Sequence, residues 1–371
     1  MHQWVWSAQV GLLLGTITFV VAFVPILMLQ YRRYGRMSFM RMLGAAATAI
    51  YITAIASYTW LPLPERSAAW CAQFGIDEIN TTPFAFLDEW RPLVQEIGIR
   101  HALRTAVVLQ VVFNVVLFIP WGIIARRFMQ MPFILAVGSG FLASLFVEAT
   151  QATGLWGIYD CAYRFADIDD LIMNTAGAFI GAVIAPVVLF CMPRTHTLVA
   201  TRAQPRPITI WRRYASMLIT MVTVVGGNFA AIVVVRMGML VIERPIGDSL
   251  AISLERLASL LIVLTLFYLP AIAGSGNIGM MVTWLAPRWL DEHNQLQKGP
   301  MLLRIMRASV VGLPYLITTW GDWAFFNLLL WVAVVLSLIM VPFTSERRSF
   351  SCLVTGGTLV DTREGRLHPA E

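Results

Sequence analysis

Charged residues are scarce in this sequence. Asp, Glu, Lys and Arg make up 13% of the 371 residues, whereas hydrophobic residues make up 58%. About a quarter of the residues of a soluble domain are charged. This composition therefore excludes a soluble domain and predicts an integral membrane protein. No solenoid repeat or low-complexity tract is visible. A cleavable signal is not expected either, since the first apolar run lacks preceding basic residues and is longer than a signal-peptide core.

Clustered metal ligands and paired catalytic groups are also missing. The sequence holds no CxxC or His-Cys cluster, and its five histidines are scattered at positions 2, 101, 196, 293 and 368. We therefore expect no metal site and no cofactor. No nucleophile-base pair accompanies the acidic residues, so the sequence leaves open whether the chain is an enzyme.

Apolar runs long enough to cross roughly 30 Å of hydrocarbon as helix recur along the chain. Strand-like alternation is absent, and helices satisfy their backbone groups internally. We predict an all-α, polytopic helical membrane protein with about nine transmembrane helices in two bundles. The expected spans are residues 8–30, 43–62, 105–124, 131–149, 171–192, 215–240, 257–273, 307–320 and 323–342. Pro314 interrupts the eighth, which we interpret as a partial span or a tilted hairpin with the ninth.

A proline-rich basic segment separates five of these spans from the other four. We predict a transmembrane domain over residues 1–192 and a cytoplasmic linker over 193–213. A second transmembrane domain is expected over 214–362, followed by a cytoplasmic tail over 363–371.

Basic residues concentrate in alternate loops. Arginines follow the first, third, fifth, seventh and ninth spans, whereas most acidic residues lie in the other loops. By the positive-inside rule this pattern predicts an exterior N-terminus and a cytoplasmic C-terminus in a bacterial plasma membrane. We interpret the net charge of +6 as anchoring to anionic lipid of the inner leaflet. We expect no nucleic-acid partner.

The four cysteines divide between the two predicted sides. Cys191 and Cys352 fall on the cytoplasmic side, where thiols stay reduced, and Cys71 and Cys161 fall in exterior loops, where a disulfide could persist. Because nothing in the sequence brings the exterior pair together, we interpret them as independent small residues, with a disulfide as the alternative.

Polar residues gather where the fourth span ends and the fifth begins. Glu148 and Gln151 lie one helical turn apart, and Asp170 and Asn174 share a helix face. Gly177 and Gly181 have the spacing that lets membrane helices approach closely. Polar groups at this depth need partners, so interhelical hydrogen bonding is the minimum expectation, and a helix cap is the alternative for Asp167 or Asp169. We favour a polar cleft that binds a ligand, formed by Asn114, Glu148, Gln151, Arg164, Asp167, Asp170 and Asn174.

This half of the sequence resembles the VanZ-like family, named for a protein linked to teicoplanin resistance. The resemblance covers roughly residues 10–190 and rests on the pattern N-x-x-x-F-x-P-x-G, then E-x-x-Q, then R-x-x-D-x-D-D-x-x-x-N-T-x-G. The matching residues are Asn114, Phe118, Pro120, Gly122, Glu148, Gln151, Arg164, Asp167, Asp169, Asp170, Asn174, Thr175 and Gly177.

The second half is similar to another membrane family, the RDD domain. The matching segments are RRYAS at 212–216, GNIG at 276–279 and ERRSFSCLVTGGTLVD at 346–361. Thr220, Met280 and the pair Ser351-Cys352 stand where that family has an aspartate, a lysine and a His-Asp pair. These departures argue against an ion-translocating role for this half.

Three functions remain open. The first is a non-enzymatic cell-envelope protein that binds a membrane lipid or a lipid-linked envelope precursor. It would modulate susceptibility to glycopeptides such as teicoplanin, the antibiotic-resistance role that the resemblance implies. The second is a membrane-embedded enzyme that acts on a lipid headgroup. The third is a transporter of small solutes or ions, which the position of the acids at the rim disfavours. The sequence does not decide the ligand or whether the chain forms a homo-oligomer.

Overall fold

The computed structural model describes residues 2–76, 79–245, 247–321, 323–344 and 346–364. The chain forms two compact units, each described here by itself. Unit 1 comprises Met1–Phe23 and Ser38–Thr195, and unit 2 comprises Val24–Met37 and His196–Glu371. Most of the predicted tail, from residue 365 onward, lies outside the described residues.

Nine helical segments within the described ranges are long and apolar enough to cross a membrane, which confirms the all-α polytopic fold. They are Gln9–Tyr34, Phe39–Trp60, Ala106–Phe128, Phe133–Ala152, Ile168–Val188, Ile210–Val241, Ser249–Ile272, Met301–Trp320 and Ala324–Phe343. The eighth is a continuous helix of 20 residues that contains Pro314, so the partial-span interpretation was wrong. The helix begins at Met301, about two turns before the predicted start at residue 307. The charged residues Arg304 and Arg307 interrupt the apolar run there, so the sequence did not indicate these turns.

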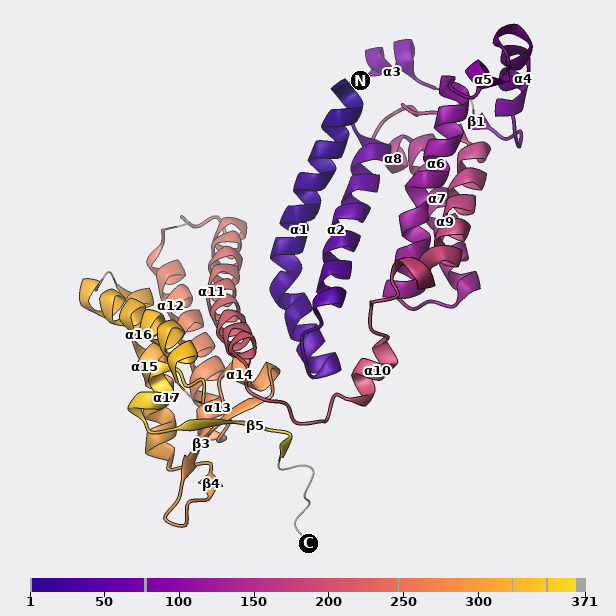
Figure 1. Cartoon of the computed structure of the whole chain (residues 1–371). Helices are drawn as coiled ribbons and strands as arrows, with labels where there is room; N and C mark the ends of the chain where they lie inside the picture. The colour runs from indigo at the N-terminus through magenta and orange to yellow at the C-terminus, as the bar shows by residue number, and fades with distance from the viewer. Residues whose placement is uncertain (1, 77–78, 246, 322, 345, 365–371) are drawn as a thin grey trace. The chain divides into compact units, whose positions relative to one another are not determined.

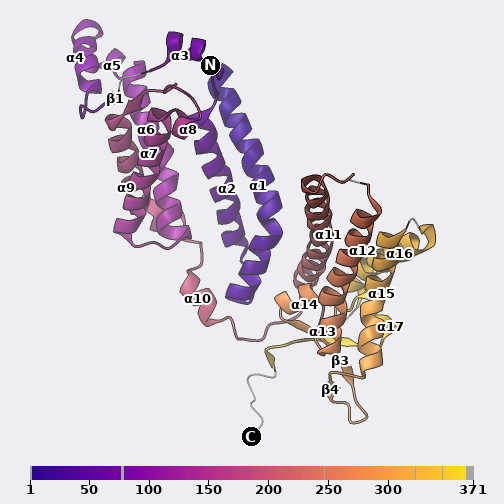
Figure 2. The same cartoon turned by 180° about the vertical axis from the view of Figure 1, so that it is seen from behind.

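Unit 1 is a helical bundle with short elements gathered at one end (Figure 1). Its elements are the N-terminal part of α1 (His2–Tyr34), then α2 (Phe39–Trp60), α3 (Ala68–Phe74), β1 (Ile79–Asn80), α4 (Phe86–Ile97), α5 (Ile99–Ala102), α6 (Ala106–Ile123), the π-helical turn η1 (Ile124–Phe128), α7 (Phe133–Ala152), α8 (Gly154–Gly157), β2 (Ala166–Asp167) and α9 (Ile168–Val188). Both Figure 1 and Figure 2 show α3, α4, α5 and α8 at the end where α9 begins.

Helices α6 and α9 pack backbone against backbone. A Cβ atom added to Gly177 would lie 2.1 Å from the carbonyl oxygen of Val115, and one added to Gly181 would lie 2.0 Å from that of Ile119. From the other side, a Cβ on Gly122 would lie 2.0 Å from the oxygen of Ala178. Only glycine fits at these separations, so the small residues fix how deeply the polar face of α9 sits in the bundle.

Two loops of unit 1 are joined at the end where α9 begins. Cys71 and Cys161 form a disulfide, Ile76 forms an antiparallel bridge to Ala162, and β1 pairs in parallel with β2. The interpretation of these cysteines as independent residues was therefore wrong. Their proximity depends on strand pairing between segments about 90 residues apart, which has no local signal in the sequence.

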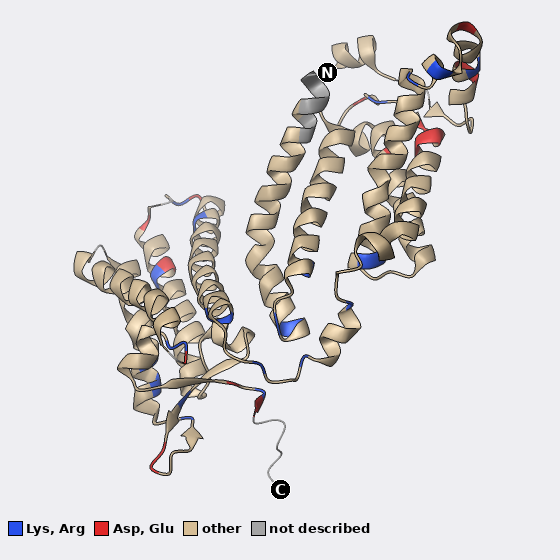
Figure 3. Cartoon of the chain, in the orientation of Figure 1, with Lys and Arg blue, Asp and Glu red and all other residues tan. Residues whose placement is uncertain are grey.

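Arginines hold the opposite end of the same bundle. Arg127 donates hydrogen bonds to the carbonyl oxygens of Leu189 and Met192, after the last turns of α9. Arg41 of α2 donates to the carbonyl oxygen of Phe128. Figure 3 shows acidic residues clustered where α9 begins, with basic residues among them, and only basic residues marked at the opposite end of unit 1.

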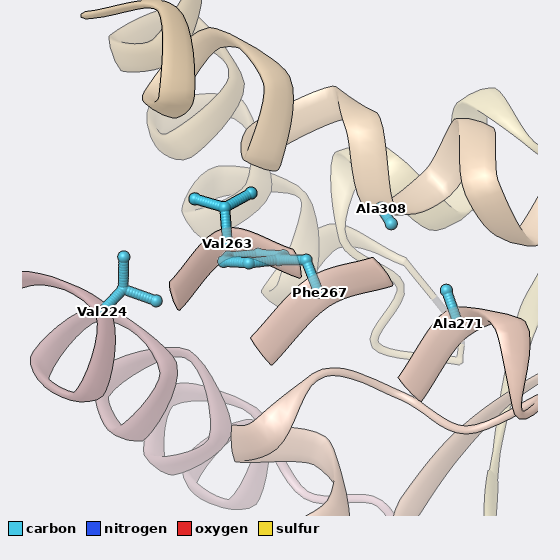
Figure 4. Packing of buried hydrophobic residues seen from close by; sticks show 5 residues of the cluster. All are labelled: Val224, Val263, Phe267, Ala271 and Ala308. Atoms are coloured by element: carbon cyan, nitrogen blue, oxygen red, sulfur yellow. The ribbon is translucent and has the colours of Figure 1, made fainter. Parts of the chain in front are cut away.

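Unit 2 combines helices with a small antiparallel sheet in the order β4-β3-β5. Its elements are α10 (Thr195–Ala200), which begins at the boundary residue, α11 (Ile210–Val241), α12 (Ser249–Val263), the π-helical turn η2 (Leu264–Tyr268), α13 (Leu269–Ile272), α14 (Ile278–Val282), β3 (Leu285–Leu290), β4 (Leu296–Gln297), α15 (Met301–Trp320), α16 (Ala324–Phe343), α17 (Phe350–Val354) and β5 (Thr358–Asp361). A core cluster joins these helices around the ring of Phe267, with Val224, Val263, Ala271 and Ala308 beside it (Figure 4).

A single carboxylate organises the sheet side of unit 2. Asp361, at the end of β5, accepts from the guanidinium of Arg212 at 2.9 Å and from that of Arg363 at 2.6 Å. The Arg363 guanidinium also lies 5.5 Å from the centre of the Trp284 ring. Burial alone would raise the pKa of Asp361, but its hydrogen bonds from Arg363 and the charge of Arg212 hold that pKa below its usual value.

Candidate functional site

The first turn of α9 carries two aspartates that fix the neighbouring loops. Asp167 is the N-cap residue, and its side chain accepts from the backbone N–H of Asp169 at 2.8 Å and from the amide of Asn80 at 2.9 Å. Asp169 is buried and accepts from the backbone N–H groups of Phe84 and Phe86. The cap interpretation of Asp167 is therefore correct, and the same residue also joins β1 to β2.

Asp170 faces α6 rather than the loops. Its carboxylate accepts from the side-chain amide of Asn114, which is buried, and Gln110, one turn earlier on α6, also donates to it. Two neutral amides thus solvate this carboxylate inside the bundle, which satisfies the expectation that a polar group at this depth needs a partner.

Helix α7 meets α9 and α2 through three further polar contacts. Glu148, which is 9% exposed, accepts from the backbone N–H of Asp167 at 3.1 Å. Asn174 donates to the hydroxyl of Ser144 at 2.9 Å, and its own carbonyl oxygen is buried without a hydrogen-bond partner in the described structure. Gln151 donates to the carbonyl oxygen of Thr59 at 3.1 Å.

Arg164 lines a cavity beside the end of α7. The cavity has a volume of about 270 Å³, and it lies against the disulfide-linked loops, with Thr153, Tyr159 and Asp160 also in its wall. One guanidinium nitrogen of Arg164 donates to the carbonyl oxygen of Leu61 at 2.6 Å. Within the described residues Arg164 forms no ion pair with a carboxylate.

The electrostatic character of this end is negative. Glu148, Asp167, Asp169 and Asp170, which we call the acidic cluster, lie within a few turns of one another and interact through their charges. Burial raises the pKa of Asp167, and the charges of Asp169 and Glu89 raise it further, against the lowering effect of its hydrogen bonds. Within the described ranges, no three Asp, Glu, His or Cys side chains converge to hold a metal ion.

The seven predicted site residues all lie at this end of unit 1, but in two sets. Asn114, Glu148, Gln151, Asp170 and Asn174 pair with other protein groups between helices, and Asp167 pairs with the loops. Arg164 is the one of the seven that lines the cavity.

Sequence reasoning missed the partner groups at this end. Asp169 stood in the quoted motif and was weighed only as a cap, although it anchors the loop at Phe84 and Phe86. Asn80, Ser144 and Thr59 had no signal, because a lone polar residue at these positions looks ordinary until the helices are assembled.

Comparison with known proteins supports the resemblance of the first half. Residues 48–190 match the VanZ/LLP1 family model, a range that holds α6, α7, α9 and all seven predicted site residues. No curated protein and no solved structure matches the chain significantly. The chain is thus a multi-pass membrane protein with a VanZ-like domain in its first half.

Proposed function

We propose that this is a cell-envelope protein of the bacterial plasma membrane. In this proposal unit 1 binds the headgroup of an envelope lipid, or of a lipid-linked precursor, and so modulates susceptibility to the glycopeptide teicoplanin. The observation that carries it is the guanidinium of Arg164 in the wall of a cavity, with no carboxylate paired to it among the described residues. The match of residues 48–190 to the VanZ/LLP1 family supports the same direction.

The chemistry of the cavity suits a headgroup that carries both a phosphate and hydroxyl or amine groups. A guanidinium forms strong paired hydrogen bonds with phosphate oxygens, and Arg164 supplies that group. Thr153 and Asp160 in the same wall offer a hydroxyl and an acceptor for sugar or amine groups. The exposed side chains of Ile79 and Trp156 at this end, 59% and 61% exposed, suit contact with the lipid to which such a headgroup is attached.

The acidic cluster has a supporting role in this proposal. Asp170 and Asn174 fix α9 against α6 and α7, and Asp167 and Asp169 fix the loops that carry the cavity wall. The predicted cleft is thereby refined to a cavity at Arg164, with the other predicted residues positioning its walls.

Charge removal at Arg164 tests this function. We expect Arg164→Gln to abolish teicoplanin protection in a susceptible bacterium that expresses the chain, while Arg164→Lys keeps part of it. Membrane abundance, measured by immunoblot, should stay near that of the unmodified protein. Arg100→Gln, at an exposed position of α5, is the matched control and should protect normally.

Two outcomes would contradict the proposal. If Arg164→Gln protects as well as the unmodified protein, the cavity has no part in the phenotype. If Arg164→Gln lowers abundance in step with protection while Arg100→Gln does not, Arg164 is a structural residue and does not bind a headgroup.

A second candidate function is catalysis on the same headgroup. Glu148 and Asp170 are carboxylates without a cationic partner within the described residues, and such groups can act as general acid or base. Incubation of the purified chain with extracted envelope lipids, followed by lipid mass spectrometry, separates the two. A mass change that is lost in Glu148→Gln would establish an enzyme, and unchanged lipid bound at stoichiometric amounts would establish a binding protein.

The proposed membrane orientation has an exterior N-terminus and a cytoplasmic C-terminus, which puts the acidic cluster outside. The arginine contacts of Arg41 and Arg127 at the other end of unit 1 support it through the positive-inside rule. A reporter fused after Leu198 should report cytoplasm, and one in the loop 63–100 should report exterior. The reverse pattern would put the acidic cluster on the cytoplasmic side and would contradict binding of a headgroup at the exterior side.

We also propose that unit 2 is a divergent RDD-like domain, on the motifs at 212–216, 276–279 and 346–361. In support, two of these segments meet, because a Cβ atom added to Gly279 would lie 1.8 Å from the carbonyl oxygen of Ser216. Experimental determination of the structure of an RDD-family protein tests this: we expect helices in the order of α11 to α17, and an unrelated order would refute the proposal.

A further inference from the structure

Two adjacent arginines at the start of α11 have opposite surroundings. Arg212 pairs with Asp361 at 2.9 Å and donates to the carbonyl oxygens of Arg206, Thr283 and Trp284. Arg213 is 0% exposed and donates from Nε to the carbonyl oxygen of Arg347 at 3.0 Å. Its two terminal nitrogens, Nη1 and Nη2, are buried and have no acceptor in the described part of the chain.

A second buried guanidinium stands beside it. Arg307 of α15 is 4% exposed, and its Nε also lacks an acceptor among the described residues. Its Nη1 lies 3.8 Å from the sulfur of Met280, and the guanidinium hydrogen-bonds the side chain of Cys352, which is itself 0% exposed. Arg213 is within charge-interaction range of both Arg307 and Cys352.

Two positive charges are thus buried together without a carboxylate. The ion pairs of unit 2 within the described residues join other arginines, and none includes Arg213 or Arg307. A guanidinium does not lose its proton in a protein, and an unpaired buried charge is strongly unfavourable. Neutralisation must therefore come from an anion.

We propose that Arg213 and Arg307 form an internal binding site for a small monovalent inorganic anion of the chloride class. The terminal nitrogens of Arg213 and the Nε of Arg307 provide N–H donors on three nitrogen atoms for one spherical acceptor. Because Arg213 is fully enclosed, the site suits a single ion and not a phosphate on a lipid.

Anion-dependent stability of the purified full chain tests the site. Thermal unfolding is followed by tryptophan fluorescence in detergent, in sodium chloride and in sodium gluconate at equal ionic strength. Because a ligand that binds only the folded state raises its stability with concentration, we expect the midpoint to rise by roughly 5 to 10 °C at about 100-fold excess over the dissociation constant. Equal midpoints in the two salts at all concentrations would overturn the proposal.

Single substitutions locate the effect. Cys352→Asp introduces a carboxylate beside the two guanidiniums, so this variant should have the same midpoint in both salts and a higher one than the unmodified protein in gluconate. Arg213→Gln should also lose the chloride dependence. Arg212→Gln is the control, because the Arg212 guanidinium is already paired with the carboxylate of Asp361. This variant should lower the midpoint equally in both salts and so keep the chloride shift. A chloride shift that persists in Arg213→Gln would place the ion elsewhere and refute the site.

Cys352→Ser separates the anion from the thiol. Serine keeps the size of the side chain and does not ionise, so the chloride shift should be unchanged if an inorganic anion is the counter-ion. If the cysteine sulfur is instead the counter-ion, the unmodified protein will show no chloride shift and Cys352→Ser will acquire one, which would contradict the proposal.

Discussion

At the end of unit 1 where α9 begins, Glu148 and Asp169 are buried carboxylates, Asp170 is half-buried, and neutral donors hold all three. Asn114 and Gln110 donate to Asp170, and backbone N–H groups donate to Glu148 and Asp169. In unit 2 buried guanidiniums outnumber the one buried carboxylate, that of Asp361. This carboxylate accepts from two of them, and backbone carbonyl groups accept from other guanidinium N–H groups. Each acid of unit 1 thus has its own donors, whereas Arg212 and Arg363 of unit 2 share one acceptor.

That difference predicts unequal sensitivity to substitution. Removal of one donor in unit 1 weakens one hydrogen bond, and the remaining donors stay in place. Removal of Asp361 leaves two buried cations without their counter-ion at once, which is among the most unfavourable changes that a folded protein meets.

The largest effect is therefore expected for Asp361→Asn. The free energy of unfolding of the chain in detergent should fall by about 3–5 kcal/mol, because Arg212 and Arg363 stay buried and lose their charge partner. Thermal unfolding of the purified protein measures this. Glu292→Gln, at an exposed position of the turn between β3 and β4, is the control and should leave the midpoint unchanged. Equal midpoints for both variants would show that the shared carboxylate does not stabilise unit 2.

The same carboxylate predicts an acid-sensitive stability. Because the pKa of Asp361 is lowered in the folded protein, its contribution is fully present above the unfolded pKa of about 3.9 and is lost as the pH falls through the lower folded value. The difference between the unmodified protein and Asp361→Asn should therefore shrink below about pH 4. A difference that is constant from neutral pH into this range would refute the ionic origin of the stabilisation.

The disulfide of unit 1 is expected to have the next largest effect. Reduction, or the double change Cys71→Ser and Cys161→Ser, should lower the free energy of unfolding by about 2–4 kcal/mol, because the two loops lose their covalent link. Under denaturing conditions without reductant, alkylation should label Cys191 and Cys352 alone. Cys191→Ser, at an exposed thiol, is the control. Labelling of all four cysteines in protein never exposed to reductant would contradict the link.

A smaller effect in unit 1 is expected at the contact between α6 and α9. Gly181→Ala puts a Cβ 2.0 Å from the carbonyl oxygen of Ile119, so the helices must separate, at about 1–3 kcal/mol. Gly138→Ala in α7 is the matched control, because its Cβ would meet no atom within 4 Å, and alanine favours helix by up to about 1 kcal/mol. Thermal unfolding that ranks the two variants in the opposite order would refute the close approach.

The transmembrane fold was predictable because it depends on composition and run length. The nine predicted apolar runs correspond to nine candidate spans among the described residues. The boundaries shifted mainly where charged or polar residues form a helix end, as with Arg304 in α15. Gly177 and Gly181 were also found by spacing alone, since a helix face repeats every three to four residues.

The pairings at the candidate site were less predictable. The face shared by Asp170 and Asn174 followed from the helix period, but their partners Asn114 and Ser144 lie on other helices at distances set by packing. The disulfide, the pairing of Asn80 with Asp167 and the cavity at Arg164 depend on loops that have no periodic pattern. Sequence reasoning therefore predicted that these residues lie together at one end of the bundle, and it could not divide them between structural pairing and cavity wall.

The smallest effect, and the sharpest contrast with Asp361, is expected at Asp167. Burial first, and then the charges of Asp169 and Glu89, raise the pKa of this carboxyl in the folded protein. Ionisation of such a carboxyl destabilises the folded protein, and this cost appears as the pH rises from the unfolded pKa of about 3.9 through the higher folded pKa. The pH dependence therefore has the opposite sign to that of Asp361.

The variant Asp167→Asn removes this charge. Its amide oxygen can still accept from the backbone N–H of Asp169. We therefore expect this variant to be slightly more stable than the unmodified protein at neutral pH, within about 0.5 kcal/mol, and to lose that advantage near pH 4. Thermal unfolding at the two pH values measures the difference. If Asp167→Asn is instead destabilised most at neutral pH, the ionised carboxylate is a net stabilising group, and the two units do not differ in the way that their buried charges suggest.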